Sequence, residues 1–162
     1  MQESENAEPK LYEIAPRLSL QEDNEFDPEA NEEAYIREEI FEHIRDIKDP
    51  EHPFSLERVG VVSVKDIEIE DRRGKSEWEN WVMLQVFFTP TIPHCSMANL
   101  IGLSIKIRLL NSLPKFFKIL VKIKPGTHVS EDGINKQLND KERVAAAQEN
   151  PYLMKEIKKC LK

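Results

Sequence analysis

The acidic charge of this chain is concentrated at its start, which limits the part that can fold. Residues 1–31 carry nine carboxylates against two basic side chains, so this segment alone accounts for the net charge of −7. It is polar, contains three prolines and lacks sustained periodicity, a composition typical of disorder. The other 131 residues balance to zero and hold the periodic apolar pattern. The sequence therefore predicts a disordered acidic tail over 1–31 and a single folded domain over 32–162.

Charge and hydropathy also exclude two classes of partner. Phosphate binding needs a clustered basic face, whereas the lysines between 115 and 124 alternate with apolar residues and indicate a solvated strand face. The most apolar stretch, 97–110, contains Lys106 and Arg108 and is shorter than the roughly 20 residues that a bilayer requires. The chain also does not open on a signal peptide. We expect a soluble intracellular protein with no direct contact to nucleic acid and no membrane anchor.

Hydrophobic periodicity predicts the elements of the folded part. An apolar stripe at helical spacing runs over 32–47, and β-branched residues over 59–64 followed by alternating isoleucines indicate a strand. A polar turn leads to a returning strand over 82–89. The later elements are a helix from Cys95 or Ser96 to about Leu110, a strand over 117–124, and helical stretches beginning at 131, 141 and 151, the last two capped by Asp140 and by Asn150 with Pro151.

This order of elements, α-β-β-α-β-α-α, predicts an α+β fold. It gives a single small domain in which helices cover a mainly antiparallel sheet. The isolated apolar group Leu11–Ile14 in the tail could be a docking peptide. Tyr152, Leu153 and Ala145–Ala147 could form a partner-binding surface, although ordinary helix packing explains the alanines as well.

Cysteine placement limits the chemistry that the chain can perform. Cys95 follows a proline-bounded loop at an expected helix start, where unpaired N–H groups and the helix dipole favour the thiolate. A small buried hydrophobe is an equally good interpretation of a lone cysteine. Cys160 is the second thiol, and the two are not in a paired Cys-x-x-Cys arrangement. Since iron–sulfur clusters are ordinarily held by four thiolates, one copy of this chain cannot complete a cluster.

Two histidines are candidate partners of Cys95. His94 is adjacent in sequence, and neighbouring residues rarely aim at one point. His128 follows the third predicted strand and could approach Cys95, which would permit nucleophilic catalysis, or metal binding together with Cys160. A loop histidine bonded to backbone is the simpler interpretation of His128. The alternative function is therefore a thiol-dependent hydrolase or transferase using Cys95 with His128.

Five segments together resemble one known family. Residues 49–53 (DPEHP), 88–97 (FTPTIPHCSM), 100–103 (LIGL), 125–128 (PGTH) and 135–147 (NKQLNDKERVAAA) are similar, in order and spacing, to the cytosolic iron–sulfur assembly component 2 family. The resemblance covers about 39–161. Met97 and Leu103–Lys106 resemble the B-type branch, as does the tail peptide 5–12. The charged hairpin 71–81 and the pair Asn111–Ser112 depart from the family pattern.

The resemblance implies a non-enzymatic subunit of the targeting complex that delivers clusters to cytosolic and nuclear apoproteins. It implies a WD40 β-propeller subunit and a HEAT-repeat adaptor as partners, a homodimer, and a cytoplasmic location with the nucleus as a second one. The family's reactive cysteine maps to Cys95, which would handle a cluster transiently as a metal ligand, with His94, His128 and Cys160 as accessory residues. No cofactor is expected to stay bound.

Overall fold

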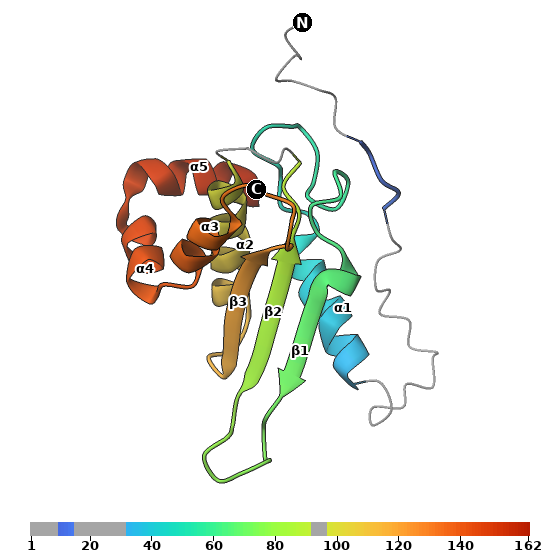
Figure 1. Cartoon of the computed structure of the whole chain (residues 1–162), viewed down its shortest axis with the longest axis vertical. Helices are drawn as coiled ribbons and strands as arrows, with labels where there is room; N and C mark the ends of the chain where they lie inside the picture. The colour runs from blue at the N-terminus through green and yellow to red at the C-terminus, as the bar shows by residue number, and fades with distance from the viewer. Residues whose placement is uncertain (1–9, 15–31, 92–96) are drawn as a thin grey trace, which may run out of the picture.

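The structure is a computed structural model that describes residues 10–14, 32–91 and 97–162. It has the α+β architecture predicted from sequence, with helices packed on a three-stranded sheet (Figure 1). The elements in chain order are α1 (Glu32–Ile44), the 3-10 helix η1 (Val64–Asp66), β1 (Ile67–Asp71), β2 (Val82–Phe88), α2 (Ala98–Ser112), β3 (Phe117–Ile123), α3 (Glu131–Leu138), α4 (Lys141–Glu149) and α5 (Pro151–Leu161). The predicted order matches as far as β3, after which the chain forms three helices, α3 to α5, where the predicted order had two.

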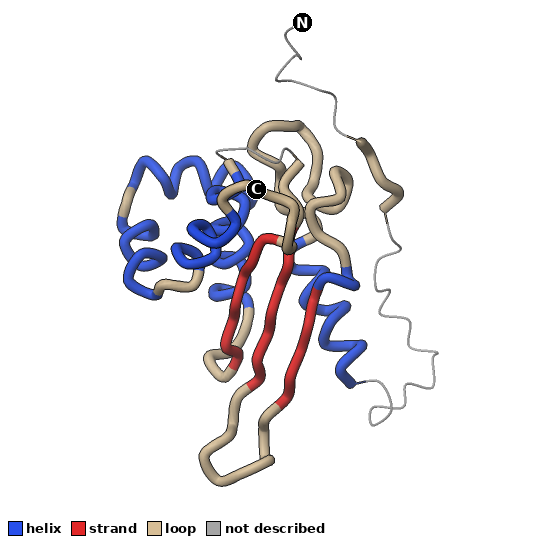
Figure 2. Tube along the Cα trace, viewed as in Figure 1, coloured by secondary structure: helices blue, strands red, loops and turns tan. Residues whose placement is uncertain are grey.

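The sheet is mixed, with strand order β1-β2-β3 (Figure 2). β1 and β2 form an antiparallel hairpin, as predicted, with Ile69 opposite Leu84. β2 and β3 are parallel, with Leu84 opposite Ile119, so the expectation of a mainly antiparallel sheet is wrong for this pair. The reason is the helix between them, because a strand–helix–strand unit returns the chain in the original direction.

One face of the sheet forms the core. Along β2, Val82, Leu84, Val86 and Phe88 are buried, whereas the intervening residues are half-buried, as the alternation predicted. α1 packs behind β1 and α2 behind β3 (Figure 1). α2 contributes a nearly continuous buried surface, and a serine and a lysine are buried within it. Within the described ranges, no helix combines the length and apolarity needed to cross a membrane.

The segment 59–66 differs from its sequence-based prediction. Its valines do not form a strand; the chain makes turns and then η1 before β1 begins. Gly60 has a φ of +74°, and Val61 N–H donates to Leu56 O at 2.8 Å, which closes a turn. Val61 and Val62 are buried in the core. Their hydrophobicity therefore serves core packing at the end of the sheet rather than strand pairing.

Both helix caps predicted from the sequence are present. Asp140 accepts the N–H groups of Glu142 and Arg143, and Asn150 accepts those of Tyr152 and Leu153. Ser130 makes no side-chain cap, although α3 still begins at the next residue. At the other end of the domain, α1 stops at Ile44, and the chain then leaves the helix in a turn closed by the Ile47 N–H donating to Ile44 O at 3.3 Å, so the predicted last helical turn to Ile47 does not form.

Candidate functional site

The two residues at the centre of the predicted site, His94 and Cys95, lie outside the described residues. The first described helical residue after them is Ala98, so α2 begins slightly later than predicted. Met97 occupies the N-cap position without a side-chain cap. The reactivity of Cys95 and any contact with His94 stay predictions.

Cys160 is a buried thiol near the end of α5. Its side chain is 3% exposed, and it shares a hydrogen bond with Ser104 of α2. Burial raises the pKa of the Cys160 thiol, and the nearby Asp49 carboxylate raises it further. The protonated thiol is therefore favoured. As an accessory ligand, Cys160 would have to lose its proton in an apolar environment, which opposes metal binding.

Asp49 lies next to Cys160 and is itself buried. Its Oδ1 accepts the N–H groups of Glu51 at 2.8 Å and His52 at 3.1 Å, so the carboxylate organises the turn at the start of the DPEHP segment. Oδ2 is buried and has no hydrogen-bond partner among the described residues. Burial raises the pKa of Asp49. The N–H of Lys48 donates to Cys160 O at 2.7 Å, which fastens this turn to the C-terminal helix.

Sequence reasoning noted Asp49 only as part of a family motif. A local signal for its structural role was present, since Asp followed by proline and polar residues is a common turn former. Its burial against α5 could not be read locally, because the contact joins segments more than 100 residues apart in sequence.

His128 is held by the loop after β3. Its Nδ1 accepts the N–H of Ser130 at 3.0 Å, and the side chain is largely buried. The interpretation of His128 as a loop histidine bonded to backbone is confirmed. A pairing of His128 with Cys95 involves a residue outside the described ranges and stays a prediction.

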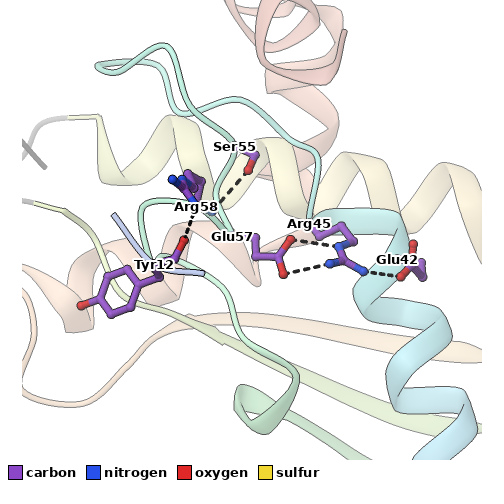
Figure 3. A network of polar contacts seen from close by, with 6 residues as sticks. All are labelled: Tyr12, Glu42, Arg45, Ser55, Glu57 and Arg58. Atoms are coloured by element: carbon purple, nitrogen blue, oxygen red, sulfur yellow. Dashed lines mark hydrogen bonds and ion pairs between the residues drawn. The ribbon is translucent and has the colours of Figure 1, made fainter. Parts of the chain in front are cut away.

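A buried ion pair joins α1 to the loop that follows it. Arg45, which is 1% exposed, makes two 2.9 Å hydrogen bonds to the Glu57 carboxylate and a further one to Glu42 (Figure 3). Such a pair fixes geometry, and removing one partner would leave a buried charge. Sequence reasoning missed it, since both residues occur in ordinary charged surroundings.

The predicted docking peptide contacts this same loop. Tyr12 N–H donates to Arg58 O at 2.8 Å, and Arg58 Nη1 donates back to Tyr12 O at 2.9 Å (Figure 3). The Tyr12 ring lies over Gly60, where any Cβ would overlap it. Residues 10–14 therefore rest on the chain's own body. The division at residue 31 stays a prediction.

Two further observations bear on the site's chemistry. In the part of the chain that the structure describes, no group of three His, Cys, Asp or Glu side chains could hold a metal ion. On the helical surface predicted to bind partners, Tyr152 is 76% exposed, Ala145 and Ala146 are exposed, and Ala147 packs against the core. The alanine stretch is thus divided between packing and solvent.

Comparison with known proteins decides the family. The chain is 50% identical over 160 residues to cytosolic iron–sulfur assembly component 2B of Mus musculus, covering 97% of this chain and 90% of that protein. It is 48% identical to MIP18 family protein galla-2 of Drosophila melanogaster (98% and 96%) and 46% identical to protein AE7 of Arabidopsis thaliana (96% and 94%). The chain belongs to the cytosolic iron–sulfur assembly component 2 (MIP18) family. No family model matches it.

Membership confirms the resemblance seen in the motifs, including its B-type character, because relatives in mouse and in Dictyostelium discoideum carry the 2B name. The match to the mouse protein extends over 160 residues and 97% of this chain, so it is not confined to one motif. The names of these relatives describe a cytosolic assembly component. The chain is accordingly a member of an iron–sulfur assembly family.

Proposed function

We propose that this protein is a non-enzymatic adaptor of the cytosolic iron–sulfur targeting complex, which helps deliver clusters to cytosolic and nuclear apoproteins. The carrying observation is the near full-length identity to cytosolic iron–sulfur assembly component 2B. Its partners in this proposal are a WD40 β-propeller subunit and a HEAT-repeat adaptor, with the protein acting as a homodimer. No cofactor stays bound; an iron–sulfur cluster passes through as cargo.

The state of the two thiols supports a transfer role for Cys95. The chain has two cysteines, and Cys160 is buried with a raised pKa. Thiolate chemistry at neutral pH therefore falls to Cys95, whose position before α2 favours ionisation on sequence grounds. Two thiols cannot retain a cluster, so a second copy or a client must supply the remaining ligands. This need for outside ligands suits an adaptor better than a carrier.

The alternative of a thiol hydrolase using Cys95 with His128 gains no support from the described contacts. A general base needs a free ring nitrogen aimed at its nucleophile. Because Nδ1 of His128 accepts the Ser130 N–H, the proton of the neutral ring lies on Nε2, and this nitrogen is then a donor rather than a base for a thiol. The adaptor is the function that we propose.

The proposal is tested in cells depleted of the endogenous protein and supplied with wild type, Cys95→Ser or Cys160→Ser. Iron incorporation into cytosolic client enzymes and copurification with the β-propeller subunit are both measured. We expect all three proteins to bind the propeller, and only Cys95→Ser to fail in client maturation. Normal clients with Cys95→Ser would refute the transfer role, and loss of the protein without effect on clients would refute the adaptor.

A further inference from the structure

The outer edge of β3 is closed by side chains. In this strand the odd-numbered residues point their backbone groups away from β2. Asn139 donates to Val121 O at 3.1 Å and accepts from Val121 N–H at 3.2 Å, which imitates the pairing of a neighbouring strand. Asn135 accepts the N–H of Ile123 at 2.7 Å, and Lys106 donates to Ile119 O. A further strand cannot add at this edge without displacing them.

The outer edge of β1 is different. Arg72 N–H donates to Trp81 O at 3.0 Å, which shows which residues of β1 are hydrogen-bonded to β2. Because bonded and non-bonded pairs alternate, Glu70 and Glu68 bond to β2, while Ile67, Ile69 and Asp71 point their backbone groups outward. The N–H of Ile67 donates to Val64 O. The N–H and C=O of Ile69 and the N–H of Asp71 bond to no described residue.

The side chains of β1 specify what such an edge would accept. Ile67 and Ile69 face the core side, and Glu68 and Glu70 are exposed on the other face. Glu70 has an exposed ion pair with Arg72 at 3.4 Å, and Glu68 has no ion pair among the described residues. Residues opposite one another on neighbouring strands attract when their charges are opposite and repel when alike. An added strand therefore gains from basic residues beside the two glutamates and from β-branched residues beside the isoleucines.

The same charges disfavour two occupants from the chain itself. Pairing of β1 with β1 of a second copy would bring the acidic side chains of both copies together. The segment 15–31 carries five carboxylates and a single basic residue, so it too would place like charges side by side. Pairing of β1 with β3 of a second copy is blocked, because Asn135 and Asn139 occupy that edge.

We propose that the β1 edge is a strand-addition site for an extended partner peptide in which lysine or arginine alternates with β-branched apolar residues. The peptide pairs antiparallel with β1 and extends the sheet to four strands. Its apolar residues lie opposite Ile67, Ile69 and Asp71; those opposite Ile69 and Asp71 form the backbone hydrogen bonds, because the Ile67 N–H already donates to Val64 O. Its basic residues lie beside Glu68 and Glu70. This inference rests on edge geometry and charge, and it stands whether or not the proposed adaptor function holds.

The test uses the full-length protein and a fluorescein-labelled synthetic peptide in which lysine and valine alternate, with binding followed by fluorescence anisotropy. Two matched peptides carry N-methyl groups either on the valine amides, which face β1, or on the lysine amides, which face away. We expect saturable binding of the parent and the lysine-methylated peptide, and loss of binding on valine methylation. A third peptide with glutamate for lysine should bind more weakly than the parent.

Protein variants test the same edge from the other side. Ile69→Pro removes the outward N–H, a change that edge strands tolerate, and Ile69→Ala is the control that keeps it. We expect the proline variant to bind about tenfold more weakly than the alanine variant. Glu68→Lys should weaken binding of the lysine peptide and improve that of the glutamate peptide. Circular dichroism establishes that each variant folds.

Several results would overturn the proposal. These are the absence of saturable binding at millimolar peptide, equal binding of the two methylated peptides, or loss on lysine methylation alone. If the molecular mass measured by analytical ultracentrifugation without peptide differs between Ile69→Ala and Ile69→Pro, the β1 edge binds a second copy of the chain instead. If Ile69→Pro does not fold, the methylated peptides still decide the question on the wild-type protein.

Discussion

The two edges of the sheet use their side chains in opposite ways. At β3, Asn135, Asn139 and Lys106 bind the outward backbone groups, so the helices finish the sheet. At β1, the N–H and C=O of Ile69 and the N–H of Asp71 form no hydrogen bond to a described residue, and the neighbouring Glu68 and Glu70 are acidic. One edge of the sheet is therefore hydrogen-bonded by side chains of the domain itself, whereas the other edge keeps backbone groups that an added strand can bind.

The largest expected effect comes from loosening the packing of α3, which carries Asn135 and is followed directly by Asn139, its C-cap. Leu138 is fully buried and lies so close to Gly102 that a Cβ there would sit 2.5 Å from Leu138 Cδ1. Leu138→Ala should lower the free energy of unfolding by about 3 kcal/mol, through lost burial and a cavity. Urea denaturation measures it. Val129→Ala, at an exposed site in the preceding loop, is the control and should change stability by less than about 0.5 kcal/mol.

Lys106 should make stability depend on pH in the alkaline range. Burial, with the charge of Lys141, lowers the pKa of Lys106 to about 8 from 10.5. Between these values the unfolded chain holds a proton that the folded chain has released, so the free energy of unfolding rises with pH. Below pH 8 both states are protonated, and the burial cost, at most about 3 kcal/mol, is constant.

The comparison variant for this pH effect is Lys106→Met, which cannot titrate. Unfolding free energies of both proteins are measured between pH 7 and pH 11. The difference between wild type and variant should shift in favour of wild type as the pH rises through the window from 8 to 10.5. A constant difference would show that Lys106 keeps an ordinary pKa at the β3 edge.

Asn139→Ala opens the β3 edge without moving a core side chain. The substitution removes three hydrogen bonds, to both backbone groups of Val121 and to Asn135 O. It should cost about 2 kcal/mol, because buried backbone groups lose their partners. Asn111→Ala, at an exposed position near the end of α2, is the matched control. Equal effects of the two substitutions would mean that β3 does not need its asparagine.

The smallest effect is expected from proline on the open edge. Since Ile69 N–H does not face β2, Ile69→Pro should be less stable than Ile69→Ala by no more than about 1 kcal/mol. At Val121, whose N–H is bound by Asn139, the same proline–alanine difference should be larger by about 2 kcal/mol. Thermal denaturation of the four variants measures both differences, and a reversed order would remove the distinction between the edges.

Sequence predicted what is set by local pattern and missed what is set by distant contacts. The alternation of Val82–Phe88 and the caps at Asp140 and Asn150 are local, and they are confirmed. The valines of 59–64 were mistaken for a strand, because β-branched composition cannot distinguish a ladder from a core-filling turn. Asn135 and Asn139 fell in a recognised family segment, but their role depends on where α3 lies against β3.

The candidate site divides in the same way. The family followed from five motifs spread along the chain, which relatives at nearly 50% identity confirm. The burial of Cys160 against Asp49 and Ser104 was not predictable, since helix periodicity places Cys160 on a face without saying what covers it. Cys95 stays a prediction drawn from its position after Pro93.

The most direct test of the difference between the edges is amide hydrogen exchange of the free full-length protein, resolved by residue with nuclear magnetic resonance. The account predicts slow exchange at Val121 and Ile123, whose N–H groups are bound by asparagine side chains, and fast exchange at Ile69 and Asp71. Protection of Ile69 and Asp71 equal to that of Val121 would contradict it, because the β1 edge would then already be occupied.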